Sequence, residues 1–203
     1  VSEDGSTRTY SYSYVNTNWH DQLTSYDGQA ITYDDIGNPL SYRGYAFTWN
    51  GRELASASKG NTAISYEYDA SSLRRSKTVN GVTTTYDYID GKLYHEKRGN
   101  DDIWYSYDDR GYLSSITLGD YRYTVGVNAR GDTDRIFGIA GDTIAIYRYD
   151  AYGQVNAIVD IYGNEITSST HIANINPIRY RGYYYDSETG FYYVSSRYYG
   201  VPS

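Results

Sequence analysis

The sequence contains no cysteine and no methionine, and it has only three histidines, three prolines and three phenylalanines among its 203 residues. Without cysteine the chain forms neither disulfides nor thiolate metal sites. It has no apolar run of transmembrane length, and its first residues, Val1–Ser6, lack a signal-peptide pattern. Lys and Arg number 18 against 25 Asp and Glu, a net charge of −7. Because phosphate binding needs clustered basic residues, this balance predicts no nucleic-acid partner.

Glycine turns and tyrosines are what the sequence has instead. Two sets of turns alternate along the chain, one including Asp90-Gly91 and Asp108-x-x-Gly111, the other including Asn80-Gly81 and Gly99-Asn100. Members of the second set follow one another at 20, 19, 20, 22 and 22 residues, from Gly60-Asn61 onward. A fixed period of this kind is the signature of a repeat architecture.

Each repeat is predicted to be one β-hairpin. Asn-Gly, Asp-Gly and Gly-Asn suit tight hairpin turns, and the runs between them, such as Thr62–Tyr68 and Val82–Tyr88, alternate with period two and are rich in Tyr, Thr, Val and Ile. Tyrosines two residues apart share a face, so aromatic ladders across neighbouring strands are expected. The predicted fold is all-β: an antiparallel hairpin meander, rolled into a spiral or a barrel-like shell segment. Two parts are expected, a repeat sheet over residues 1–170 and a hairpin with a truncated tail over 171–203.

The repeat unit Tyr105-Ser-Tyr-Asp-Asp-Arg-Gly-Tyr-Leu113 resembles the tyrosine-aspartate (YD) repeat of rearrangement-hotspot (RHS) proteins. The run from Asn176 to Tyr199 is similar to the RHS repeat-associated core. The repeat-signature residues are Tyr33, Asp34, Gly37, Tyr66, Tyr68, Asp69, Tyr86, Tyr88, Tyr105, Tyr107, Asp108, Gly111, Tyr147, Tyr149, Asp150 and Gly153. The core-motif residues are Arg179, Tyr180, Arg181, Gly182, Tyr183, Tyr185, Asp186, Gly190, Tyr192, Tyr193, Arg197, Tyr198 and Tyr199.

The resemblance implies a β-sheet shell on a secreted or surface-bound bacterial protein, placed before a C-terminal toxin. The family continues after its core with a self-cleaving Asp-Pro element, whereas this sequence ends Gly200-Val-Pro-Ser203. The aspartates of that element therefore have no counterpart here. This departure favours a segment that is not itself an enzyme.

Other candidate sites are better explained by structure than by catalysis. The isolated histidines match no metal-ligand spacing, and the paired acids sit at turns, where Asp bonds its own backbone. Ser195-Ser196 lacks the surroundings of a nucleophile, and the run Gly126–Gly131 is no phosphate loop because no helix follows it. The residues considered are His20, His95, His171, Asp34-Asp35, Asp101-Asp102, Asp108-Asp109 and the aromatic groups Phe47-Thr-Trp49 and Trp104-Tyr-Ser-Tyr107. No catalytic, cofactor-binding or metal-binding residue is predicted.

The leading hypothesis is a non-enzymatic shell segment that encloses or presents a C-terminal toxin. One alternative is a glycan-binding module of the cell wall that uses its exposed tyrosines; another is an element that self-assembles through an open strand edge. The expected partners are upstream repeats and a downstream effector of the same parent chain, with cell-wall glycan and further copies of the chain as candidates. No cofactor, nucleic acid or membrane span is expected.

Overall fold

The computed structural model describes residues 9–195 and 197–201. Residues 1–8, 196, 202 and 203, which include Ser196 of the serine pair and the end of the tail, lie outside the described part. The described chain is almost entirely antiparallel β-strand, with one short α-helix, which confirms the predicted fold class. No helix in this part of the chain has the length and apolar character to cross a membrane.

Consecutive strands pair in strict sequence order, from β4 to β16. The chain divides into two compact units, residues 1–66 and 67–203. The strands up to the boundary are β1 (Tyr12–Ser13), β2 (Ser25–Tyr26), β3 (Gln29–Ala30), β4 (Ser41–Tyr42), β5 (Tyr45–Asn50), β6 (Glu53–Lys59) and β7 (Thr62–Tyr68). In the first unit, Phe47 is buried and stacks on Tyr45, while Trp49 donates from Nε1 to the Pro39 carbonyl at 2.7 Å.

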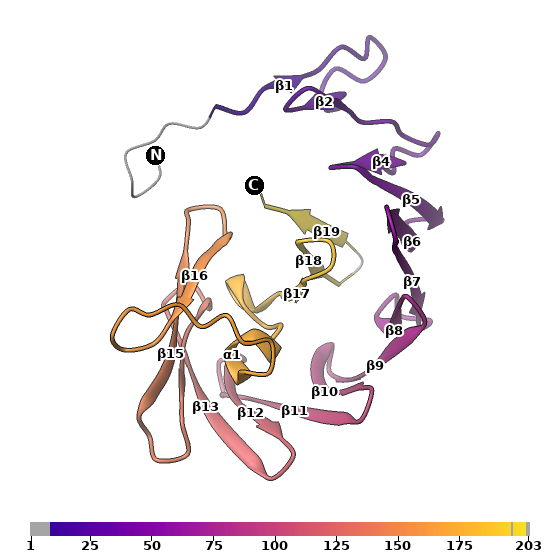
Figure 1. The fold of residues 1–203 in the computed structure, drawn as a ribbon. Helices are drawn as coiled ribbons and strands as arrows, with labels where there is room; N and C mark the ends of the chain where they lie inside the picture. Colours follow the sequence, from indigo (N-terminus) through magenta and orange to yellow (C-terminus); the bar gives the residue numbers. More distant parts are fainter. Residues whose placement is uncertain (1–8, 196, 202–203) are drawn as a thin grey trace. The chain divides into compact units, whose positions relative to one another are not determined.

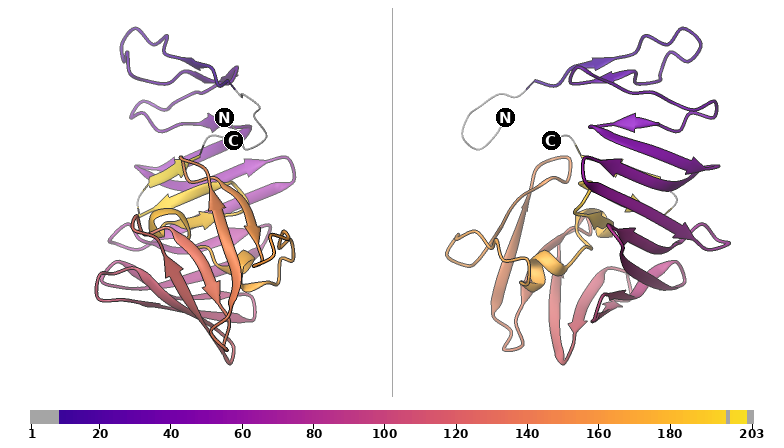
Figure 2. Two further views of the ribbon diagram at one scale, coloured as in Figure 1. Left: turned by 90° about the vertical axis from the view of Figure 1, so that its left-hand side faces the viewer. Right: turned by 45° about the vertical axis from the view of Figure 1, so that its right-hand side comes forward.

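The second unit contains the longer strands and a C-terminal segment. Its repeat strands are β8 (Arg74–Val79), β9 (Val82–Ile89), β10 (Lys92–Arg98), β11 (Asp101–Tyr107), β12 (Leu113–Leu118), β13 (Tyr121–Val127), β14 (Thr133–Phe137), β15 (Thr143–Tyr149) and β16 (Val155–Val159). The C-terminal segment comprises α1 (Ile172–Ile175), the 3₁₀ turn η1 (Tyr180–Gly182), β17 (Tyr184–Asp186), β18 (Phe191–Val194) and β19 (Arg197–Gly200). Strands β8 to β16 curl around this segment (Figures 1 and 2).

Turn chemistry explains why the strands reverse where they do. Asn80-Gly81 and Asp90-Gly91 have positive φ at both residues, the geometry that keeps the right-handed twist through a two-residue hairpin. The longer turn at Asp108 is closed differently: its Oδ1 accepts hydrogen bonds from the backbone N–H of Arg110 at 3.1 Å and of Tyr112 at 2.8 Å. The carboxylate thereby satisfies backbone donors that the turn leaves unpaired.

The strand register does not produce the expected ladders of tyrosine on tyrosine on the buried face of the sheet. Tyr105 faces Ile116 on the neighbouring strand, and Tyr147 faces Ile158. The repeats therefore alternate a buried tyrosine with an aliphatic residue, because the return strands carry their large apolar residue at the facing position.

The sequence predicts two strands for the C-terminal hairpin, Arg179 to Tyr185 and Phe191 to Tyr199, joined by a loop over residues 186–190. The structure differs from both. The predicted strand from Phe191 to Tyr199 is two strands, β18 and β19, separated at Ser195, which has φ 54°. The predicted strand from Arg179 begins instead as η1, where Arg181 has φ 52°. Positive φ interrupts an extended strand, and neither Ser nor Arg signals it in the sequence.

Candidate functional site

A buried arginine joins the C-terminal hairpin to the sheet in the second unit. Arg74 on β8 is fully buried, and its guanidinium carbon lies 4.8, 4.8 and 4.5 Å from the ring centroids of Tyr86, Tyr184 and Tyr193. Its Nη1 donates to Asp186 Oδ2 at 2.6 Å, where Asp186 is also fully buried. The cation is thus neutralised by one carboxylate and surrounded by aromatic faces, which attract it electrostatically.

Asp186 takes a second cation on its other oxygen. Lys77 Nζ donates to Asp186 Oδ1 at 2.8 Å and to Glu188 Oε2 at 2.9 Å. Burial by itself would raise the pKa of Asp186, but the charges of Arg74 and Lys77 outweigh burial and hold that pKa below its ordinary value. The group is therefore a carboxylate at neutral pH.

A second ion pair, with a buried carboxylate, lies on β10, two strands further along the sheet. Glu96 on β10 is fully buried, accepts from Arg98 Nη2, and accepts from the Tyr184 hydroxyl at 2.8 Å. Tyr184 therefore contacts both charge clusters, one through its ring and one through its hydroxyl. Every carboxylate in the two clusters has a charged partner, so the clusters fix the hairpin against the sheet.

His95, on β10, is held between two aspartates on the sheet surface. Its Nδ1 lies 2.8 Å from Asp87 Oδ2, its Nε2 lies 3.0 Å from Asp102 Oδ1, and its ring stacks on Trp104 at 4.1 Å. A histidine that acts as a general base must present an unprotonated ring nitrogen to the substrate. Both ring nitrogens of His95 face carboxylate oxygens instead.

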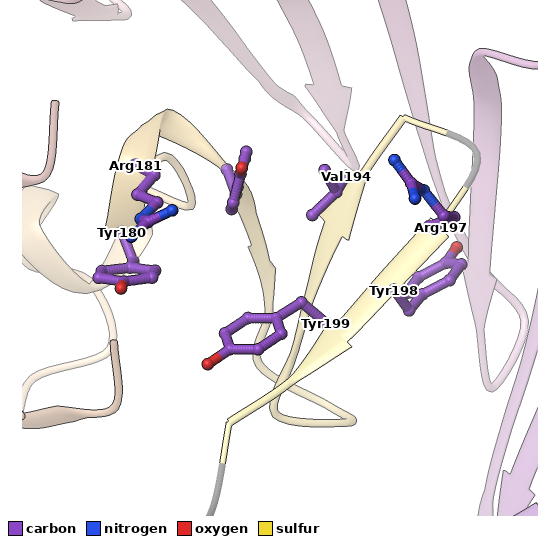
Figure 3. Close-up of a pocket in the computed structure, with 7 residues that line it drawn as sticks. Tyr180, Arg181, Val194, Arg197, Tyr198 and Tyr199 are labelled. Atoms are coloured by element: carbon purple, nitrogen blue, oxygen red, sulfur yellow. The ribbon is translucent and has the colours of Figure 1, made fainter. Parts of the chain in front are cut away.

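The C-terminal hairpin and η1 line a pocket of about 370 Å³. It is lined by two arginines, four tyrosines and one valine: Tyr180, Arg181, Tyr183, Val194, Arg197, Tyr198 and Tyr199 (Figure 3). We call it the arginine–tyrosine pocket. Both arginine side chains are exposed, and no carboxylate lies within 4 Å of either guanidinium among residues 9–195 and 197–201.

The aromatic walls of this pocket are fixed by hydrogen bonds. Tyr199 stacks on Tyr180 at 6.4 Å between ring centroids, and its hydroxyl donates to the Tyr152 carbonyl at 2.9 Å. The Tyr198 hydroxyl lies 3.0 Å from the Tyr68 hydroxyl. Arg181 lies over the Tyr180 ring at 5.3 Å, with its backbone N–H donating to Asp132 Oδ1 at 2.9 Å. The pocket therefore offers cations and rings in set positions.

Most residues singled out in the sequence lie in turns or in the packed interior. The Asp34, Asp69, Asp108 and Asp150 side chains each accept backbone N–H bonds within their own turns. His171 accepts from the Ala173 N–H at the start of α1, and burial lowers the pKa of its imidazole. Within the described residues, no three His, Asp or Glu side chains are grouped so as to hold a metal ion.

Of the buried charges, Asp186 was named in the sequence as part of the core motif, whereas Arg74, Lys77 and Glu96 were not. The repeat nevertheless carries a signal for Lys77 and Glu96. Lys77 and Glu96 take the strand position that Ile116, Ile136 and Ala57 fill in other repeats, all of them buried. A charged residue at a position that is otherwise apolar in every repeat indicates a buried ion pair, because an unpaired buried charge is too costly. Aligning the repeats by their turns would have found both residues.

Comparison with known proteins finds relatives among tRNA nucleases. The chain is 35% identical over 97% of its length to "tRNA nuclease WapA" of Bacillus subtilis strain 168, and equally so to "tRNA3(Ser)-specific nuclease WapA" of Bacillus spizizenii. "tRNA(Glu)-specific nuclease WapA" of B. subtilis subsp. natto is 35% identical over 88% of the chain. The chain spans 8% of the length of these relatives. No family model matches it.

Solved structures share the fold at lower identity. The Photorhabdus luminescens Tc holotoxin pore, with mutation TccC3-D651A, superposes with a TM-score of 0.61 at 17% identity, covering 94% of this chain and 11% of that one. TcdB2-TccC3 gives a TM-score of 0.58 at 17% identity, covering 83% and 9%. At this identity the likeness concerns the fold, which is that of RHS shell structures.

These relatives correct the functional predictions. The prediction of a non-enzymatic shell segment is wrong, as is the prediction that the segment is not itself an enzyme, since the relatives matched over nearly all of it are named tRNA nucleases. The glycan-binding and self-assembly alternatives do not fit those names either. The error arose because the lack of a catalytic motif in 203 residues was used to judge a protein whose relatives extend far beyond this segment. Sequence and fold comparisons together support an RHS-like family for the chain.

Proposed function

We propose that this chain is part of a toxin that cleaves tRNA. The observation that carries the proposal is its 35% identity, over 97% of its length, to proteins named tRNA nucleases. Identity at this level extends through strands, turns and the C-terminal hairpin rather than through one motif. We further propose that Asn176 to Tyr199 is the RHS repeat-associated core of a bacterial toxin that is secreted or held at the cell surface; the motif in this run and the RHS-like family of the chain support this assignment.

The relatives named for serine tRNA and for glutamate tRNA match this chain with the same identity. The shared segment therefore supports a reaction class, the cleavage of tRNA, and does not distinguish between the two tRNAs. Within the described residues, the groups best suited to RNA are the exposed arginines and fixed tyrosines of the arginine–tyrosine pocket. RNA recognition relies on cations that contact phosphate and on aromatic rings that stack against unpaired bases.

The test uses the whole parent protein, purified and incubated with serine and glutamate tRNA transcripts, with the products separated on a denaturing gel. The proposal expects discrete fragments of at least one tRNA that accumulate with time. The same assay on the 203-residue chain maps how much of the activity lies within it. Intact transcripts of both tRNAs, and of an unfractionated tRNA pool, after prolonged incubation with the parent would contradict the proposal.

A further inference from the structure

We propose that the arginine–tyrosine pocket binds single-stranded RNA, with Arg181 and Arg197 on phosphate groups and the tyrosine rings against unpaired bases. This inference rests on the proposed function, because it gives the tRNA-cleaving protein an RNA contact outside its reacting groups. It goes against the composition-based expectation of no nucleic-acid partner. That expectation depended on the net charge of −7, whereas binding depends on the charges that face the ligand.

The local charge of the pocket is positive although the chain is acidic. Arg181 and Arg197 are exposed and have no carboxylate within 4 Å among residues 9–195 and 197–201. Several other arginines in the second unit are paired with carboxylates, among them Arg98 with Glu96, Arg110 with Asp108 and Arg130 with Asp132. An arginine that a fold leaves without a carboxylate keeps its full capacity to bind phosphate in a bidentate manner.

The acid nearest to Arg181 does not cancel its charge. Asp132 is fully buried beneath the pocket, and its Oδ1 accepts from the Arg181 backbone N–H. Its Oδ2 accepts from Arg130 Nε at 3.1 Å and from Asn128 Nδ2 at 2.7 Å. Asp132 therefore holds the turn that presents Arg181, while Arg130 compensates its charge.

The aromatic groups of the pocket stand at the edge of a packed cluster, in which Tyr180 is buried and Tyr183 and Tyr199 pack against it. Tyr198 and Tyr199 are half-buried, and each is anchored at its hydroxyl. The ring centroid of Tyr199 lies 6.4 Å from that of Tyr180 and 6.5 Å from that of Tyr192, and the latter two are 6.1 Å apart. Figure 3 shows Tyr180 and Tyr199 flanking the cavity, with Arg181 above Tyr180 and Arg197 beside Tyr198. Fixed rings lose little conformational freedom when a base stacks on them.

A second cavity continues from the first. It measures about 290 Å³ and shares Arg181, Tyr183 and Val194 with the arginine–tyrosine pocket. Its lining adds Lys92 and Tyr112, from turns of the repeat sheet. Two adjoining cavities, each with a cation and tyrosines, suit consecutive nucleotides of one strand. Grooves that bind single-stranded nucleic acid combine cations, which contact the phosphates, with aromatic rings, which stack on the bases. Such contacts tolerate any base sequence.

A pocket that binds RNA of any base sequence agrees with the names of the relatives, which specify different tRNAs. Contacts to phosphate and stacked rings carry no direct sequence information. A pocket built from them can therefore be common to proteins named for different tRNAs. The same chemistry also separates RNA from a glycan, since a glycan would show no dependence on salt.

The test measures binding of a fluorescein-labelled 12-nucleotide single-stranded RNA to the 203-residue chain by anisotropy, with unfractionated tRNA as competitor. The double variant Arg181→Gln/Arg197→Gln is expected to lose roughly tenfold in affinity. Two phosphate contacts predict a log–log salt slope of about −1.4, which the double variant should abolish. Tyr199→Leu is expected to lose about fivefold or more through stacking, with its salt slope unchanged. Arg197→Lys should bind within a few-fold of the unmodified chain, because the charge remains.

The matched control is Arg75→Gln/Arg148→Gln, which removes two exposed arginines from β8 and β15 and leaves the pocket intact. Far-UV circular dichroism and the unfolding midpoint establish that each variant is folded. Crosslinking with 4-thiouridine RNA, followed by peptide mapping, should mark the 180–183 and 197–199 segments. Equal affinity and equal salt slope in the pocket variant and the control would overturn the inference, as would crosslinks confined to other segments. Cleavage of tRNA by the parent together with that result would leave the proposed function standing, so the two failures are distinguishable.

Discussion

Arg74 Nη1 lies 2.6 Å from Asp186 Oδ2, and neither side chain has any exposed surface. The two residues are 112 positions apart in sequence. One begins a return strand of the repeat sheet and the other ends β17 of the C-terminal hairpin. This buried pair, with Lys77 as its third member, holds the hairpin in place and thereby supports the arginine–tyrosine pocket that the hairpin lines.

Replacing Asp186 should strongly destabilise the second unit. Asp186→Asn leaves Arg74 buried without its carboxylate and leaves Lys77 with Glu188 alone. Breaking one side of a buried ion pair costs about 3–5 kcal/mol. Urea unfolding followed by tyrosine fluorescence measures the change in the free energy of unfolding. The control is Asp109→Asn, an exposed turn residue, expected within about 0.5 kcal/mol of the unmodified chain. Equal stability of the two variants would show that the pair contributes nothing.

The same carboxylate should make stability depend on pH on the acid side. The pKa of Asp186 is lower in the folded chain than the unfolded value of about 3.9. Its contribution to stability is therefore present above about pH 4 and is lost as the pH falls through the folded pKa. Urea midpoints measured between pH 7 and pH 3 should fall more steeply for the unmodified chain than for Asp186→Asn. Parallel curves would contradict this assignment.

Gly153 should be the least replaceable glycine of the wide turns. Its φ is +95°, and a Cβ there would lie 2.4 Å from Cγ of Tyr180, a wall of the pocket. Gly153→Ala should combine about 1–2 kcal/mol of left-handed backbone strain with a further roughly 1–3 kcal/mol from overpacking. Gly141→Ala is the matched control, because Gly141 has φ +84° and open space around its Cα. If both variants unfold at the same urea concentration, the contact with Tyr180 does not contribute to the loss of stability.

Tyr184→Phe tests the second charge cluster. The variant keeps the ring beside Arg74 but removes the hydroxyl that donates to Glu96 Oε2 at 2.8 Å. Hydrogen bonds to charged groups contribute about 1.5–3 kcal/mol, so a loss in that range is expected from thermal or urea unfolding. Tyr162→Phe, at an exposed tyrosine, should leave stability unchanged. If Tyr184→Phe leaves the free energy of unfolding unchanged, Glu96 is held by Arg98 alone.

The repeat, its turns and the all-β fold were predictable because each depends on chemistry local in sequence, such as Asn80-Gly81 or the turn carboxylate of Asp108. Strand alternation likewise placed Tyr105 and Tyr147 on the buried face. The break between β18 and β19 was not predictable, since Ser195 is not a residue that favours positive φ.

The arginine–tyrosine pocket was not predictable for a different reason. The sequence places Arg181 and Arg197 in one motif, but it does not show which acidic side chains lie next to them in the fold. Asp186 turns inward to Arg74, and Asp132 pairs with Arg130. Only the folded arrangement separates the paired cations from those left for a ligand.

The most direct measurement is the action of the whole parent protein on tRNA, compared with that of the parent carrying Arg181→Gln and Arg197→Gln. Discrete tRNA fragments are expected from the unmodified parent, and slower cleavage from the variant, most evident at low tRNA concentration. A parent protein that leaves serine, glutamate and unfractionated tRNA intact would contradict the proposed cleavage of tRNA.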